Sequence, residues 1–303
     1  MVNARWIAVV LVIIGASSYG ILSSFIKIAF ASGFKDGQIT VAQITAGALM
    51  LWILVAFNKK SWVNPFRGPW IQLACIGIFG LSLTTIFYNS SLTHLDASLS
   101  IVLLFQFTWM TIAMDCIARK RLPRPNETLA IIVIMIGTLL DVNIFGANWS
   151  QLSGKGILFG LLSGLTYSLF LFMTGQVKSD LPPLMKSAVM ITAAIPMIYL
   201  VYPPNIFLDG NTLQLLGWGL MLGFFGQVVP TIAFNVGIPR IGSTLAAMLG
   251  SIELPVAIVA AFLLLGEPVL LVQWLGMILI LAGILLSEKR SRAEIAKIVR
   301  NER

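Results

Sequence analysis

The segment IGSTLAAMLGSIELPVAIVAAFLLL, residues 241 to 265, carries a single charged side chain, Glu253, at its centre. A helix rises about 1.5 Å per residue, so about 20 apolar residues cross the roughly 30 Å of hydrocarbon in a bilayer. This segment is therefore long enough to span a membrane. The composition agrees, because 58% of the 303 residues are hydrophobic, 11% are charged and the mean hydropathy is +0.93. Such a balance is typical of an integral membrane protein and excludes a soluble domain of this size.

A search for uncharged windows of that length predicts ten transmembrane helices. The expected spans are residues 6–31, 39–57, 69–91, 97–118, 126–143, 156–178, 182–202, 212–234, 241–265 and 269–287. The first span begins like a secretory signal, with Arg5 before an apolar run. Because the apolar stretch continues to Ala31 and more membrane segments follow, we interpret it as an uncleaved first helix.

The distribution of basic residues predicts the orientation of these helices. Seventeen of the 20 Lys and Arg residues fall in segments that ten spans place on the same side as both chain ends. Only Lys35 and Lys155 fall on the other side, and Lys27 lies inside the first span. Positively charged loops remain in the cytoplasm, so both termini are predicted to be cytoplasmic in a bacterial-type cytoplasmic (plasma) membrane. This orientation accounts for the net charge of +8 without a nucleic-acid partner.

The sequence contains few residues that could bind a metal or a cofactor. Cys75 and Cys116 are far apart, and His94 is the only histidine. We interpret the cysteines as reduced packing thiols, and we expect no cofactor and no metal. An enzyme acting on lipid within the membrane is disfavoured, because His94 has no nucleophile or base pattern around it.

A shift of 146 residues aligns the chain with itself without a gap. It brings Asn89 onto Asn235 and Gly137 onto Gly283, together with several aliphatic pairs. An odd number of helices in each repeat places the second repeat upside down relative to the first. The fold prediction is therefore an all-α membrane protein with ten transmembrane helices in two inverted five-helix repeats. The expected boundaries are 1–145 for the first repeat, 146–288 for the second and 289–303 for a basic cytoplasmic tail.

This inverted arrangement is typical of secondary transporters, whose binding site lies near the bilayer midplane. Glu253 is at that depth, where an acidic residue costs roughly 2.5 to 3.5 kcal/mol on insertion scales. Its carboxyl group could face a cavity and exchange a proton for substrate, or it could hydrogen-bond between packed helices. Pro255 lacks a backbone N–H and is expected to bend the helix beside it, leaving the Ser251 carbonyl unpaired.

Further polar and aromatic residues inside the spans complete the predicted site. The candidates for substrate binding or coupling are Glu253, Asn89, Asn235, Gln106, Tyr19, Tyr167 and Phe105. The two asparagines could equally cap neighbouring helices, and aromatic residues at helical spacing are also typical of packed or lipid-facing surfaces. Lys27, about one turn inside the outer end of the first helix, is either a snorkelling side chain or an outer gate.

The segment from Ile252 to Leu286 resembles the end of an EamA-type repeat of the drug/metabolite transporter superfamily. It contains an acidic-x-Pro run, a Gly-Glu turn and a Gln-x-x-Gly helix with a glycine near its end. The matching residues are Glu253, Pro255, Gly266, Glu267, Gln273, Gly276 and Gly283. The first half matches less well, because Arg121 stands where the turn glutamate would be and Trp109 where the proline would be.

This resemblance implies a ten-helix transporter with a central cavity formed by both repeats, and no enzyme activity. The expected function is secondary active export of a small amphipathic metabolite, such as an amino acid or amine, by alternating access, with proton coupling through Glu253 as a hypothesis. One alternative is a facilitative or drug/nucleoside-type metabolite transporter without proton coupling. Another is a membrane partner protein that does not transport. The expected partners are a small-molecule substrate, the lipid bilayer and protons.

Overall fold

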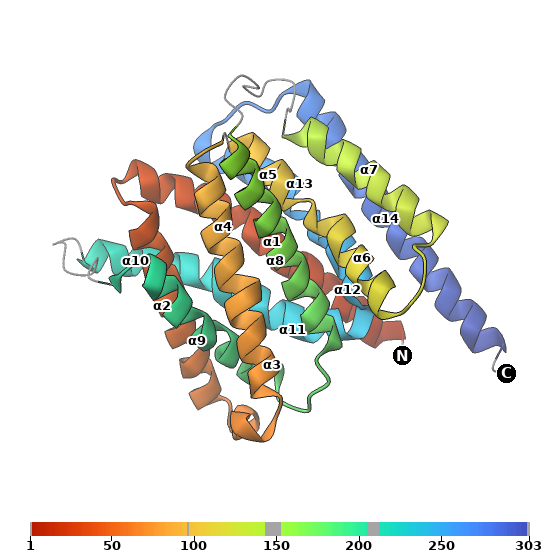
Figure 1. Ribbon diagram of the computed structural model, residues 1–303, viewed down its shortest axis with the longest axis horizontal. Helices are drawn as coiled ribbons and strands as arrows, with labels where there is room; N and C mark the ends of the chain where they lie inside the picture. Colours follow the sequence, from red (N-terminus) through yellow and green to blue (C-terminus); the bar gives the residue numbers. More distant parts are fainter. Residues whose placement is uncertain (1, 96, 143–152, 205–211, 302–303) are drawn as a thin grey trace.

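The computed structural model describes residues 2–95, 97–142, 153–204 and 212–301, which form a helical bundle (Figure 1). The helices of the first half are α1 (Val2–Ala31), α2 (Asp36–Phe57), α3 (Trp70–Cys75), α4 (Leu83–Leu92), α5 (Ala97–Leu104), α6 (Phe107–Ala118) and α7 (Pro125–Asp141). Those of the second half are α8 (Gly154–Gln176), α9 (Pro183–Val201), α10 (Thr212–Gly223), α11 (Val229–Ile241), α12 (Ser243–Gly250), α13 (Glu253–Leu265) and α14 (Leu271–Asn301). Two π-helical segments, η3 (Ile76–Ser82) and η7 (Phe224–Val228), join α3 to α4 and α10 to α11.

Eight helical segments in the described part of the chain are long and apolar enough to cross a membrane. They are Arg5–Ala31, Asp36–Phe57, Trp70–Leu92, Leu99–Ala118, Gly154–Gln176, Pro183–Val201, Leu213–Ile241 and Ser243–Leu265. The two remaining predicted spans correspond to α7, which has 17 residues, and to the shorter apolar stretch Leu271–Leu286 of α14. The predicted eighth span stops too early, because its helix continues past residue 234 to Ile241 and ends at Gly242, whose φ of 84° breaks the helix.

The 146-residue shift matches the irregular features of the two halves. The shift carries η3 onto residues 222–228, which include η7. It also carries the last residue of α5 onto the last residue of α12, and the first residue of α6 onto the first residue of α13. Each half therefore has a π turn in its third membrane segment and an interruption in its fourth. Helix interruptions at membrane depth occur where the backbone lines a cavity or is covered by protein.

Helices α7 and α14 lie side by side at one edge of the bundle, as Figure 1 shows. The glycines that the repeat brings into register lie at this interface. A Cβ atom on Gly137 would come within 2.9 Å of the Gly276 carbonyl oxygen, and one on Gly283 would come within 2.6 Å of the Ile134 side chain. Small residues here let the two helix backbones approach closely, which stabilises pairs of membrane helices.

We expect Gly276→Ala to lower the thermal unfolding temperature of the detergent-purified protein. The added methyl group would overlap the backbone of Asp141, and such overpacking costs about 1 to 3 kcal/mol. Gly217→Ala on α10 is the matched control, because nothing lies within 4 Å of a Cβ at that position. If both variants unfold at the wild-type temperature, the close approach of α7 and α14 is not what holds this edge together.

Candidate functional site

The bundle has two ends, which we name by the chain segments that meet there. The terminal face carries the start of α1, the turn at residues 119–124 and Gly242, and both chain ends lie on this side in Figure 1. The opposite face carries the turn at residues 32–35 and the turn at residues 266–270. Lys27 and Glu267 meet on the opposite face, with 2.9 and 3.1 Å between Nζ and the two carboxylate oxygens.

A cavity of about 260 Å³ extends from the middle of the bundle towards the opposite face. Its walls come from α1, α2, α4, α5, α8 and α13, so both halves of the chain contribute. Glu253 lines its deep end, and Phe30, Asp36 and Leu92 line it where α1 ends, α2 begins and α4 ends. The cavity therefore connects the predicted midplane carboxyl group to one face of the bundle.

Glu253 owes its position to the interruption between α12 and α13. It is the first residue of α13, and its partly exposed side chain faces the cavity. Gly20 of α1 packs against this turn, and a Cβ there would lie 2.5 Å from the Glu253 carbonyl oxygen. Within the described residues, the Glu253 carboxyl group makes no hydrogen bond or ion pair. It is thus an acidic group held at membrane depth and open to a solute.

The expected role of Pro255 needs a correction. The helix is interrupted before the proline, at Ser251 and Ile252, and Pro255 lies in the first turn of α13. A proline there sacrifices no helical hydrogen bond, because the first N–H groups of a helix have no partner within it. The Ser251 carbonyl was expected to be unpaired, but it accepts a hydrogen bond of 3.4 Å from the Leu254 N–H.

Three other predicted site residues line the same cavity. Tyr19 and Tyr167 lie together with their ring centroids 6.4 Å apart in an edge-on arrangement, and the buried Tyr167 hydroxyl has no hydrogen-bond partner among the described residues. Asn89 donates hydrogen bonds of 3.0 Å from Nδ2 to both carboxylate oxygens of Asp36. A carboxyl group, two phenol rings and an amide therefore converge on one space.

Two predicted residues lie away from the cavity lining. Asn235 is buried, and its Nδ2 donates to Ser187 Oγ at 3.0 Å and lies 3.3 Å from Met190 Sδ, so it connects α11 to α9. Phe105 is fully buried against Phe107, with 5.2 Å between ring centroids.

Gln106 lies at the interruption between α5 and α6, also outside the cavity lining. Its Nε2 donates to the Val102 carbonyl at 3.0 Å, and its Oε1 accepts from Trp109 Nε1 at 2.7 Å. Lys27, the outer-gate candidate, likewise does not line the cavity. It joins α1 to the α13–α14 turn through its ion pair with Glu267, which sequence reasoning had placed as a turn residue.

Asp36 and Tyr88 are among the cavity residues that sequence reasoning missed. The predicted second span began at residue 39, which left Asp36 in a loop, whereas α2 begins at this residue. An acidic residue in the first turn of a helix is favourable and marks a helix start, so this signal was present. Tyr88 precedes Asn89 on α4. Its position within a largely apolar segment did not distinguish it as a site residue. With Asp36 included, the charged residues among those lining the cavity are two acids and no bases.

On the side of the terminal face, aromatic packing closes the bundle. Tyr167 packs edge-on against Phe107 at 4.7 Å and stacks on Phe170 at 5.9 Å, and Phe170 in turn lies 6.0 Å from Phe234. Phe107, Phe170 and Phe234 are almost completely buried. Phe170 and Phe234 lie further along α8 and α11 towards the terminal face, so the rings separate the cavity from that face.

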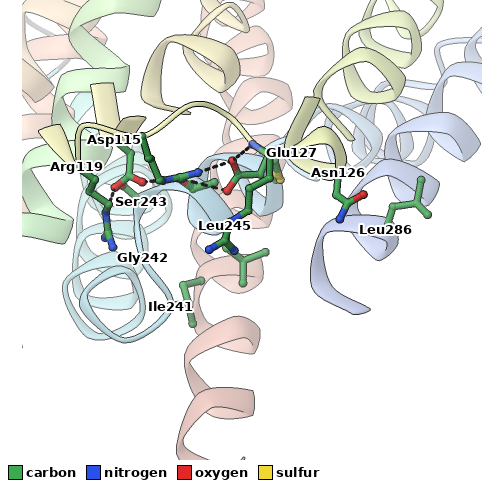
Figure 2. Close-up of a pocket in the computed structure, with 13 residues that line it drawn as sticks. Asp115, Arg119, Asn126, Glu127, Ile241, Gly242, Ser243, Leu245 and Leu286 are labelled. Atoms are coloured by element: carbon green, nitrogen blue, oxygen red, sulfur yellow. Dashed lines mark hydrogen bonds and ion pairs between the residues drawn. The ribbon is translucent and has the colours of Figure 1, made fainter. Parts of the chain in front are cut away.

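A charged network on the terminal face lines a second pocket of about 270 Å³, which Figure 2 shows. Asp115 on α6 is bound by Arg119 Nε and Arg121 Nη2, both at 2.9 Å. Arg121 also pairs with Glu127 at 2.7 Å. These hydrogen bonds, that with Glu127 above all, raise the pKa of the Arg121 guanidinium, which stays charged. Thr244 on α12 donates to Asp115 at 3.2 Å and so ties the two halves together.

Comparisons with known proteins agree with this architecture. The sequence profile of the EamA-like transporter family matches residues 6–142 and again 154–288. The chain is 21% identical over 274 residues to the uncharacterized transporter YcbK of Bacillus subtilis (strain 168), covering 88% of each protein. It is 23% identical over 205 residues to an uncharacterized transporter of Archaeoglobus fulgidus, covering 68% of this chain and 72% of that protein.

The fold is also similar to a solved structure described as "Crystal structure of protein". The TM-score is 0.72 at 16% sequence identity, over 97% of this chain and 99% of the other. The two family matches together include all the helices that build the cavity. This chain is therefore a multi-pass integral membrane protein that belongs to the EamA-like transporter family.

Proposed function

We propose that this protein is a secondary active transporter that exports a small amphipathic amine by alternating access, with Glu253 as the group that binds the ammonium. The observation that carries the proposal is the Glu253 carboxyl group, which faces a cavity at membrane depth without a partner among the described residues. An ionisable residue inside a membrane protein is expensive to keep and typically marks a substrate or ion pathway.

The lining of the cavity favours a cation over other solutes. Its charged residues are Glu253 and Asp36, and the rings of Tyr19, Tyr88 and Tyr167 supply aromatic surface. Phenol rings attract ammonium groups through their electron-rich faces, while the apolar wall accepts a hydrocarbon chain. The carboxylate of a zwitterionic amino acid would find no lysine or arginine in this lining. We therefore favour an amine over an amino acid.

The closed terminal face supports alternating access. A solute bound at Glu253 can leave towards the opposite face, while the aromatic rings and the Asp115 network separate it from the terminal face. The interruptions in α5–α6 and α12–α13 provide matched points at which the two halves can tilt. In the orientation that the basic residues predict, with both termini in the cytoplasm of a bacterial-type plasma membrane, this conformation is open to the outside.

Proton coupling follows from the same carboxyl group. Because Glu253 lacks a described protein partner, either a proton or an ammonium group can neutralise it, and the two compete for one site. Binding of the amine then releases a proton, and reprotonation from the outside displaces the amine. This competition is the simplest mechanism for exchange of the two cations.

We expect Glu253→Gln to abolish exchange driven by a pH gradient in proteoliposomes that contain a radiolabelled alkylamine. Removing one partner of a desolvated charge pair costs about 2 to 5 kcal/mol, so amine affinity should fall by at least about 30-fold. Asp180→Asn is the control, because this exposed acid lies before α9 and does not line the cavity.

Three results of that experiment would contradict the proposal in different ways. Full dependence on the pH gradient in Glu253→Gln would refute coupling through this residue. Amine transport by the wild type without any effect of pH would favour a facilitative or drug/nucleoside-type transporter. Absence of transport of amines, amino acids and nucleosides by the wild type would favour a membrane partner protein that does not transport.

We further expect Thr244→Val to increase the opening of the terminal face. The substitution removes a hydrogen bond to the charged Asp115, worth about 1.5 to 3 kcal/mol, with little change in shape. Cys116, buried next to Asp115, reports the opening through its rate of reaction with a polar maleimide in a Cys75→Ser background.

Labelling of Cys116 should become at least about threefold faster in Thr244→Val, if about half of that interaction is lost. Thr128→Val is the control, because Thr128 is exposed and its hydroxyl donates to the nearby Arg124 carbonyl, at the start of the same helix. Equal labelling rates in the two variants would show that the contact between α6 and α12 does not hold this face closed.

A further inference from the structure

We propose that Asp36 is a second recognition carboxylate in the cavity and that the preferred solute is a diamine, with one ammonium group at Glu253 and the other at Asp36. This inference rests on the proposed function, because it presupposes an amine at Glu253. It adds the class of substrate and a specificity-determining residue to that function.

Asp36 lies at the mouth of the cavity, in the first turn of α2. Its carboxylate is held in place by side chains from α2 and α4. Asn89 Nδ2 donates to both oxygens at 3.0 Å, and Thr40 Oγ1 donates at 3.3 Å. These contacts fix the orientation of the carboxylate and leave it at the edge of the space that Glu253 lines.

The partners of Asp36 are all neutral, and this decides what the residue can do. An amide and a hydroxyl group donate hydrogen bonds and stabilise a negative charge, but they do not cancel it. No lysine or arginine forms an ion pair with Asp36 within the described residues. Among the described residues, Asp115, Glu127 and Glu267 each pair with a basic residue, whereas Asp141 and Asp180 form no ion pair and do not line this cavity. Asp36 and Glu253 are therefore the two described acids that both line the cavity and lack a basic partner.

The cavity is long enough to separate two ammonium groups. Gly20 touches the turn that carries Glu253, and Phe30 lines the mouth, so the cavity follows about ten residues of α1, or about 15 Å. The wall between the two acids is largely apolar, with Leu22 and Ile26 among its residues. A hydrocarbon chain with an ammonium group at each end matches this order of acid, apolar wall and acid.

A purely structural role for Asp36 makes a different prediction. As the first acid of α2, it interacts favourably with the helix dipole and anchors Asn89. If that were its whole role, removing the charge would weaken the protein or its transport without regard to the charge of the solute. The ratio of diamine to monoamine transport separates the two roles, because structural damage lowers both rates together.

The test measures uptake into proteoliposomes of a series of diamines, from diaminopropane to diaminooctane, beside the monoamines butylamine and hexylamine. We expect the wild type to prefer the diamine over the monoamine of equal chain length by at least tenfold, with an optimum at an intermediate length. Asp36→Asn should lower diamine uptake about tenfold more than monoamine uptake. Glu253→Gln should lower both. Asp180→Asn, an exposed acid in the turn before α9, is the control that should leave the ratio unchanged.

A variant that retains the charge provides a second test in case Asp36→Asn does not fold. Asp36→Glu extends the carboxylate by one methylene group, so it should keep the preference for diamines and shift the optimum chain length. Equal preference of the wild type for monoamines and diamines, or an equal loss of both in Asp36→Asn, would overturn this inference while the proposed amine transport stands. Absence of any amine transport by the wild type would overturn both.

Discussion

An acidic side chain inside hydrocarbon is the constraint on which this structure depends. Glu253 cannot remain there unless protein, water or a solute offsets the loss of hydration, and the described protein offers it no hydrogen bond. The chain meets this constraint by interrupting a membrane helix, so that the carboxyl group projects from a helix start into a cavity. The interruption, the cavity and the close approach of α1 at Gly20 are therefore parts of a single arrangement.

The sequence predicted those parts of the architecture that depend on the hydrophobicity of a continuous segment. Apolar length located most of the membrane helices to within a few residues, because exclusion of charge from hydrocarbon leaves a clear pattern. The eighth span is the exception, since it was predicted to end seven residues before Ile241. The pairing of Gly137 with Gly283 predicted a repeat, and the structure places both glycines at the contact between α7 and α14. Helix interruptions were harder to predict. Pro255 pointed to one of them, but the matching interruption after Leu104 has no proline and depends on packing between helices far apart in sequence.

The candidate site was predictable only in part, for a related reason. Glu253, Asn89, Tyr19 and Tyr167 stood out as polar or aromatic residues at membrane depth, and all four line the cavity. Asn235 is equally polar and matches Asn89 in the repeat, yet it bonds to Ser187 in a packed interface. Composition and depth are the same for the two asparagines, so their surroundings can be distinguished only by the tertiary arrangement. Asp36 was missed because a helix boundary in the sequence was placed three residues too late.

Backbone positions that the repeat matches carry side chains with different roles in the two halves. The first residue of α13 is Glu253, which faces the cavity, whereas the first residue of α6 is Phe107, which packs into the aromatic barrier against Tyr167 at 4.7 Å. Likewise Asp115 anchors the network on the terminal face, while the position that the repeat matches to it is Ala261. Backbone pseudo-symmetry can provide two related conformations, but the side chains make them unequal. The carboxyl group in the cavity thus comes from the second repeat and the acid of the terminal-face network from the first, while both repeats contribute to the rest of the cavity lining and to the aromatic packing.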